Sequence, residues 1–333
     1  MRVAVDVGYG FTKAVSGSGG RACFPSVAAP HRGDVLGVAE VVGIGRVGHR
    51  VSVRYLDARR EEHLVGEAAR ESFLASGFLG AEKPENLHNL LLLAGVYLVG
   101  GGSTGQFPEP LELAVGLPLA FYRSQGKALR ERLLRLKAWV SVDGGEERCV
   151  SFSRVLVLPQ GVGVVFHQGL PEGRGYAGVL DIGEYTTDYL LVDLETGKPL
   201  AEACGSVQAG CHLVGHVVSV AWLQATGEPL PPRLLPGVLK DLAEGGRTVF
   251  RGRELDLSLA YRTALEQAAE TIARQVLSVW KDLTSRLAVT YLAGGGSLLL
   301  GDALAGRFPN PVLVSDPVFA NALAYLEALD GSR

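Results

Sequence analysis

The feature that most constrains the fold of this chain is a short motif that occurs twice. Residues 2–7 (RVAVDV) and residues 179–182 (VLDI) each have the pattern of a buried strand that carries an aspartate and runs into a glycine turn. In both places the chain returns as a second strand, at residues 11–15 and 189–192. This weak internal repeat predicts two similar α/β domains that face each other.

Composition and length agree with two domains of an ordinary cytoplasmic protein. The chain has 333 residues and a net charge of −3, so nothing global favours direct binding to nucleic acid. Its four cysteines lack CxxC spacing, which predicts buried thiols in a reducing compartment. The N-terminus lacks a signal-peptide pattern, and the longest apolar run, residues 90–99, is too short for a bilayer. We therefore expect a soluble cytoplasmic protein without a membrane partner.

The remaining elements alternate between strand and helix. In the first half we expect strands at 111–117, 138–142, 148–152 and 155–158, and helices at 86–98 and 122–136. In the second half, residues 206–285 are expected to be mainly helical, with a long helix at 264–287, strands at 289–293 and 312–314, and a last helix at 319–329.

The two hairpins supply what a nucleoside triphosphate requires. Phosphate oxygens need backbone N–H donors in tight glycine turns, and Mg²⁺ prefers carboxylates, usually through water. The first hairpin offers Asp6, Gly8, Gly10, Thr12 and Lys13, and the second offers Asp181, Gly183, Thr186, Thr187 and Asp188. A third glycine cluster, residues 294–296, follows a predicted strand and strengthens this interpretation.

In this order and spacing the motifs resemble the actin-type ATPase superfamily. Asp6–Lys13 resembles its first phosphate loop, Asp181–Asp188 its second, and Leu292–Ser297 its adenosine loop. Val157–Gly163 resembles the first connecting segment. Three stretches are similar to the archaeal and plasmid-segregation (ParM-type) actins: Asp6–Gly10, Val115–Leu119 and Asp316–Ala322.

The resemblance implies an α/β, actin-like fold. It would have two RNase H-like domains, each with a mixed central sheet flanked by helices, and a nucleotide in the interdomain cleft. Domain I would comprise residues 1–160, with an inserted subdomain at about 25–85 and the C-terminal helix, 316–333, packed back on it. Domain II would comprise residues 161–315, with an inserted helical subdomain at about 206–287.

The resemblance also implies roles for individual residues. Nucleotide binding falls to Gly8, Tyr9, Gly10, Thr12, Lys13, Gly183, Glu184, Tyr185, Thr186, Gly210, Gly294, Gly295, Gly296 and Ser297. Backbone amides of the two loops would hold the phosphates, and Gly294–Gly296 would let adenine and ribose lie against the backbone. Gly210 would let a helix approach the sugar or base.

The expected catalytic residues are two aspartates and a glutamine. Asp6 and Asp181 would contact Mg²⁺ through water, Lys13 would neutralise phosphate charge, and Gln160 would position the attacking water. The cofactors would be ATP or GTP with Mg²⁺. Asp188 could orient water or stabilise its hairpin, and the sequence leaves both open.

One residue departs from the family pattern. Glu184 stands where the second loop usually has glycine. A carboxylate beside a phosphate would repel it by roughly 1–4 kcal/mol at about 4 Å. We expect its side chain to point away from the phosphate; contact with magnesium or altered hydrolysis are the alternatives.

The resemblance implies a nucleotide-dependent filament-forming ATPase of a prokaryotic cytoskeleton or of plasmid and DNA segregation. Its partners would be further copies of itself and a DNA-binding adaptor protein. The alternatives are a small-molecule kinase, a chaperone ATPase and a non-polymerising regulator of the same fold. A zinc site at His212 and His216 has suitable spacing, but Cys211 offers the one further ligand.

Overall fold

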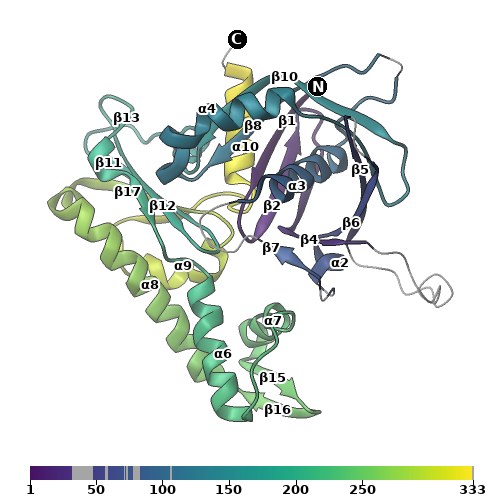
Figure 1. Ribbon diagram of the computed structural model, residues 1–333. Coiled ribbons are helices and arrows are strands. Elements are labelled where there is room, and N and C mark those ends of the chain that lie inside the picture. The colour runs from purple at the N-terminus through teal and green to yellow at the C-terminus, as the bar shows by residue number, and fades with distance from the viewer. Residues whose placement is uncertain are drawn as a thin grey trace. The chain divides into compact units, whose positions relative to one another are not determined.

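The computed structural model describes residues 1–31, 48–56, 59–70, 72, 74–77, 83–105 and 107–331 (Figure 1). Part of the subdomain predicted at 25–85 lies outside these residues. The chain forms two compact units, Met1–His167 together with Val318–Arg333, and Gln168–Pro317. No helix in the described part of the chain has the length and apolar character needed to cross a membrane.

The first unit contains a large mixed sheet and several helices. Its strands are β1 (Arg2–Val7), β2 (Phe11–Ser16), β3 (Arg21–Pro25), β4 (Val27–Pro30), β5 (His49–Tyr55), β6 (Glu61–Val65), β7 (Ser76–Gly77), β8 (Leu111–Leu117), β9 (Lys137–Val142) and β10 (Arg148–Pro159). Its helices are α2 (Glu67–Arg70), α3 (Glu85–Leu98), α4 (Leu119–Arg135), α5 (Val162–Gln168), which ends at the boundary, and α10 (Ala320–Gly331). The strand order is β3-β2-β1-β8-β10-β9-β5-β6-β4-β7.

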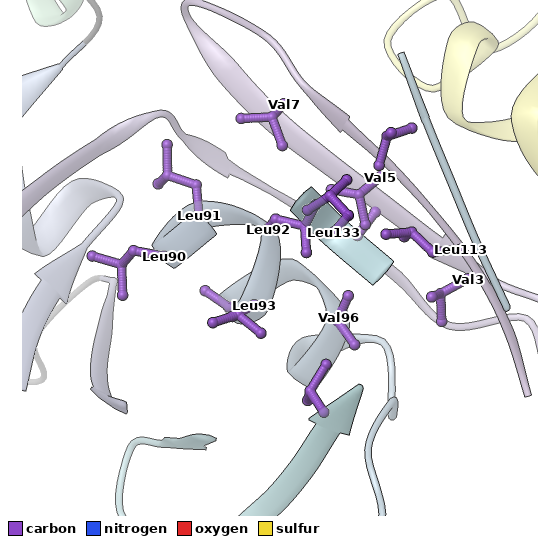
Figure 2. Packing of buried hydrophobic residues seen from close by; sticks show 14 of the residues in the cluster. Val3, Val5, Val7, Leu90, Leu91, Leu92, Leu93, Val96, Leu113 and Leu133 are labelled. Atoms are coloured by element: carbon purple, nitrogen blue, oxygen red, sulfur yellow. The ribbon is translucent and has the colours of Figure 1, made fainter. Parts of the chain in front are cut away.

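Strand β1 lies within this sheet and is covered on both faces. Side chains alternate along a strand, so Val3, Val5 and Val7 share one face. They join the core formed with the leucines of α3, as Figure 2 shows. Ala4, on the opposite face, packs with Tyr325 of α10. A nearly continuous apolar sequence is what a strand covered on both faces requires.

The second unit is built around a smaller mixed sheet. Its strands are β11 (Tyr176–Ile182), β12 (Thr187–Asp193), β13 (Lys198–Pro199), β14 (Gly205–Val207), β15 (Arg247–Phe250), β16 (Arg253–Asp256), β17 (Leu287–Ala293) and β18 (Pro311–Leu313). Its helices are α6 (His212–Thr226), α7 (Leu235–Gly245), α8 (Ser258–Trp280) and α9 (Ser297–Ala305), with short 3₁₀ turns η1 (Ala201–Ala203) and η2 (Lys281–Arg286). The order is β13-β12-β11-β17-β18, and β14 also pairs with β12.

The strand pairing confirms the internal repeat. In the first unit, β1 pairs antiparallel with β2 and parallel with β8, which pairs parallel with β10. In the second unit, β11 pairs antiparallel with β12 and parallel with β17, which pairs parallel with β18. Both aspartates occupy the same place in this plan, since Asp6 and Asp181 are the penultimate residues of β1 and β11.

The segment predicted to be helical at 206–287 is not helical throughout. Strand β14 and the two-stranded hairpin β15–β16 lie within it. The hairpin turns on Arg251 and Gly252, whose φ angles are 48° and 75°. Positive φ at both central residues of a two-residue loop is the geometry that matches the twist of a hairpin. The Arg-Gly pair between two alternating segments was the signal that the prediction missed.

Two strands that were predicted separately in the first unit form one continuous strand. Residues 148–152 and 155–158 form the single strand β10. Its first part pairs with β9 and its second part with β8, with a register shift between Phe152 and Arg154. The shift marks the place where one strand changes its pairing partner, and it coincides with Ser153 and Arg154, the polar residues that separated the two predicted strands.

Candidate functional site

The first glycine loop follows β1 and is held in shape by its own backbone and by Ser26. The Gly8 amide donates to the carbonyl oxygen of Phe11 at 3.1 Å. A Cβ atom at Gly8 would lie 2.7 Å from that oxygen, so only glycine fits. Ser26 donates its hydroxyl to the Gly8 carbonyl at 2.7 Å and its amide to the Gly10 carbonyl at 2.9 Å. These bonds engage the carbonyl oxygens of both glycines in this loop.

Three residues predicted from two motifs meet at the end of β1. Asp6 is buried, with 3% exposure, and accepts a hydrogen bond from Nε2 of Gln160 at 2.9 Å. Lys13 lies opposite Asp6 in the β1–β2 register and places Nζ 3.3 Å from the second carboxylate oxygen. Strands β1, β8 and β10 are parallel, so their carboxyl ends lie at one edge of the sheet. This arrangement brings Gln160 to Asp6 across 154 residues of sequence.

The backbone around Gln160 is fixed from two sides. Its amide donates to the carbonyl oxygen of Leu117 at 2.8 Å. The next amide, of Gly161, donates to Oδ1 of Asn321 on α10 at 3.0 Å, and this bond is buried. The sequence assigned no role to Asn321 or Ser26, although Asn321 stands in the quoted stretch Asp316–Ala322. Both position the backbone of predicted site residues.

The second glycine loop repeats the geometry of the first. The Gly183 amide donates to the carbonyl oxygen of Thr186 at 2.9 Å, as Gly8 does to Phe11. The start of α6 holds the loop where Ser26 holds the first: Cys211 donates its amide to the Gly183 carbonyl at 3.1 Å. His212 donates both its amide and Nδ1–H to the Glu184 carbonyl, each at 2.9 Å. The loop is therefore pinned to the first turn of α6.

Gly210 is required by this close packing. A Cβ atom there would lie 2.5 Å from the Gly183 carbonyl oxygen and 2.6 Å from that of Glu184. The contact is between two backbones of the second unit. The need for glycine at 210 therefore comes from the loop, and the expected contact with a sugar or base stays a prediction.

The third glycine cluster packs on the same loop, and its three glycines differ. Gly294 has a φ of 79°, and a Cβ atom there would lie 2.5 Å from Oδ1 of Asp181. Gly296 donates its amide to the Ile182 carbonyl at 2.9 Å, and a Cβ atom would meet the side chains of Ile182 and Cys211. Gly295 is exposed and has open space around its Cβ position. Gly295 is therefore the member of the cluster that can face a ligand.

Ser297 and Asp188 make structural hydrogen bonds. Ser297 is buried and donates its hydroxyl to the Gly294 carbonyl at 2.7 Å, which closes the turn before α9. Asp188 is buried opposite Ser206 in the β12–β14 pair and accepts a hydrogen bond from its hydroxyl. This contact joins β12 to β14, and the two roles left open for Asp188 both stay predictions.

Glu184 influences the groups behind the loop. Burial, and then the nearby Glu184 carboxylate, raise the pKa of the Cys211 thiol to about 12. The same two causes raise the pKa of Tyr185. The negative charge of Glu184 is therefore felt on the side of the loop that faces α6. Whether the carboxylate also influences a phosphate stays a prediction.

The zinc alternative finds no support in the described part of the chain, where no three His, Cys, Asp or Glu side chains gather as metal ligands. His212 uses Nδ1 for the Glu184 carbonyl, and its ring lies 5.1 Å from that of Tyr185. His216 is exposed on α6. The spacing of the two histidines reflects one structural residue and one surface residue.

Comparison with known families now identifies the class. The family described as "Actin like proteins N terminal domain" matches residues 4–163. The family described as "Archaeal actin homologue MreB-like, C-terminal" matches residues 179–306. These matches cover most of both units, and the chain therefore belongs to the actin-like superfamily. The predicted fold class, with two domains of mixed sheet flanked by helices, is confirmed.

Within the superfamily the chain is similar to archaeal actin homologues and to ParM. It is 28% identical to the archaeal actin homologue of Thermoplasma acidophilum, over 99% of each chain. The crystal structure of an archaeal actin homologue in complex with ADP matches with a TM-score of 0.80 and 26% identity, over 99% of this chain and 100% of that one. A 15-stranded ParM filament from Clostridium botulinum matches with a TM-score of 0.86 and 23% identity, over 99% of both chains.

Proposed function

We propose that this protein is an actin-like, Mg²⁺-dependent nucleoside triphosphatase that assembles into filaments when it binds ATP or GTP. The observation that carries this proposal is the repeated hairpin. Both units present a buried aspartate at the same register, followed by a glycine loop closed by the same backbone hydrogen bond. The archaeal relative solved with ADP and the ParM relative solved as a filament support nucleotide binding and self-assembly.

The two loops would bind the phosphates through their backbones. The Gly8 and Gly183 amides close their turns, so we assign the phosphate contacts to the amides that follow them, at residues 9–10 and 184–186. Lys13 adds positive charge beside Asp6. Gly295, which has open space at its Cβ position, would lie against the base or ribose.

The carboxylates suit a magnesium ion held through water. Asp6 already accepts hydrogen bonds from Gln160 and Lys13. A magnesium ion that keeps its water ligands and contacts Asp6 through them therefore fits this site better than an ion bound directly to the carboxylate. Asp181, with 7% exposure, occupies the equivalent place in the second hairpin. Magnesium would neutralise phosphate charge during transfer.

Gln160 would orient the attacking water. Its Nε2–H donates to Asp6, which leaves the amide oxygen Oε1 as an acceptor for a proton of water. Asp6 and the Asn321 contact to Gly161 both restrict where that oxygen can lie. Phosphoryl transfer depends mainly on positioning and electrostatics, so a fixed acceptor is the contribution expected of this residue.

In the cell we propose a cytoplasmic role in a cytoskeleton or in DNA segregation, with a DNA-binding adaptor as partner. The net charge of −3 supports an adaptor in place of direct DNA binding. Head-to-tail contacts that do not close produce open filaments, so self-association needs no second protein.

The test is assembly of the purified full chain. We expect light scattering and electron microscopy to show filaments with Mg²⁺ and ATP or GTP but not with EDTA, and phosphate to be released. The Asp181→Asn variant should bind nucleotide but release phosphate more slowly. Phosphate release without any filaments would support the non-polymerising ATPase instead. Phosphate transfer to a sugar in a coupled assay would support the kinase.

A further inference from the structure

The first unit contains a cavity that the proposed triphosphatase does not explain. It has a volume of about 270 Å³ and lies among the start of α3, the helix α4 and the end of β8. Its apolar wall includes Leu117, Phe121 and Leu129. Of the predicted nucleotide-binding residues, only Tyr9 takes part in the lining.

The polar wall of this cavity is cationic. Lys83 and Arg132 both line it, and none of its lining residues carries a carboxylate. Arg132 has an acidic partner in Glu85, whose Oε2 lies 3.7 Å from Nη1 of Arg132. Glu85 is 61% exposed, so solvent screens its charge. A ligand that enters the cavity therefore meets two positive charges and an apolar surface.

Arg132 is held by a buried histidine. Nη2 of Arg132 donates to Nδ1 of His88 at 3.2 Å, and His88, with 4% exposure, also lines the cavity. Burial, and then the charges of Arg132 and Lys83, lower the pKa of His88 to about 3. His88 is therefore neutral near pH 7 and can accept this hydrogen bond. A neutral buried acceptor fixes the guanidinium without neutralising it, as an anion-binding arginine requires.

Lys83 connects the cavity to the first glycine loop. Its ammonium donates to the carbonyl oxygen of Val7, next to Asp6, and lies 4.5 Å from the centre of the Tyr9 ring. An anion that attracts Lys83 competes with both contacts. A ligand in the cavity is thus placed to alter the end of β1 from within the same unit.

We propose that this cavity binds a small phosphate monoester on an apolar body. The phosphate would pair with Arg132, whose planar guanidinium matches phosphate oxygens in a bidentate manner, and with Lys83. The body would pack on Phe121 and Leu129. The volume fits a molecule smaller than a nucleoside triphosphate, since ligand pockets for drug-sized molecules start near roughly 300 Å³. This proposal does not depend on the proposed triphosphatase activity.

The experiment measures binding of phenyl phosphate to the full chain by calorimetry, with inorganic phosphate and phenol as the separate halves of the ligand. We expect saturable binding of phenyl phosphate and binding at least about tenfold weaker for either half. The Arg132→Gln variant should bind phenyl phosphate at least about tenfold more weakly than the wild type. Arg123→Gln, an exposed position on the same helix, should change it less than about twofold.

Two further variants keep the test decisive. Gln125→Glu places a negative charge in the lining of the cavity, so it should weaken binding of the phosphate monoester. Because Gln125 is exposed, this variant tests the proposal even if Arg132→Gln destabilises the fold. Lys13→Gln removes the positive charge beside Asp6, next to the first glycine loop. Absence of saturable binding would overturn the proposal. So would binding lost in Lys13→Gln and unchanged in Arg132→Gln and Gln125→Glu, since this result would place the phosphate at the glycine loop.

Discussion

The sharpest prediction concerns Gly294 and Gly295, two neighbouring glycines to which the sequence analysis gave the same role. Gly294 has a φ of 79°, which costs a residue with a side chain about 1–2 kcal/mol. A Cβ atom there would also lie 2.5 Å from Oδ1 of Asp181 and meet the Ile182 carbonyl, and such overpacking costs about 1–3 kcal/mol. Gly294→Ala should therefore lower the free energy of unfolding by about 2–5 kcal/mol. Gly295→Ala meets no atom within 4 Å and should leave it unchanged.

Thermal unfolding measures this difference. One kcal/mol shifts the Tm of a domain of 150–250 residues by about 2–4 °C, so Gly294→Ala should lower Tm by about 4 °C or more. Gly295→Ala serves as the matched control, and in the proposed function it should weaken nucleotide binding while Tm stays constant. The reasoning is refuted if Gly294→Ala melts within 1 °C of the wild type, or if both variants are destabilised equally.

Three further predictions follow from individual contacts. Gln160→Ala should lower phosphate release about 10²-fold while nucleotide affinity stays within a few-fold, and an equal loss of both would argue against water positioning. The His212→Ala variant removes the Nδ1 hydrogen bond to the second loop and should weaken nucleotide binding, and His212→Asn should restore part of the affinity. His216→Ala, at an exposed position on the same helix, is the control, and an equally large loss of affinity in this variant would contradict the prediction. The pKa of His88 is lowered to about 3, below its unfolded value near 6.5, so the folded state favours the neutral ring. Stability should fall as pH drops from about 6.5 towards 3, by up to about 1.4 kcal/mol per pH unit, and the slope should flatten in His88→Gln; an unchanged slope in pH-dependent unfolding would count against it.

The sequence was most informative about local structure. Alternating apolar residues and glycine turns predicted both hairpins, because period and turn chemistry depend on neighbours in the chain. The repeat of this plan at 2–15 and 179–192 pointed correctly to two related sheets. The sequence-based prediction failed at the hairpin β15–β16. The turn of this hairpin begins with Arg251, a residue that does not by itself favour positive φ.

The sequence was less informative about the reasons for individual residues. It grouped Gly294, Gly295 and Gly296 as one ligand-facing loop, whereas two of them are needed for packing on β11. It gave Gly210 the role of letting a helix approach the sugar or base, and it did not predict that a Cβ atom there would also meet the backbone of the second loop. Such requirements depend on which backbone lies nearby, and that backbone is distant in sequence.

The sequence by itself determined the two hairpins, the glycines that shape their turns and the superfamily, because these are encoded in short-range spacing. Only the tertiary structure decided that Gln160 reaches Asp6, and that His212 and Asn321 hold backbone segments of the site. The physical reason is strand order: parallel strands that are far apart in sequence end at one edge of a sheet, and residues beyond those ends meet only after the sheet has formed.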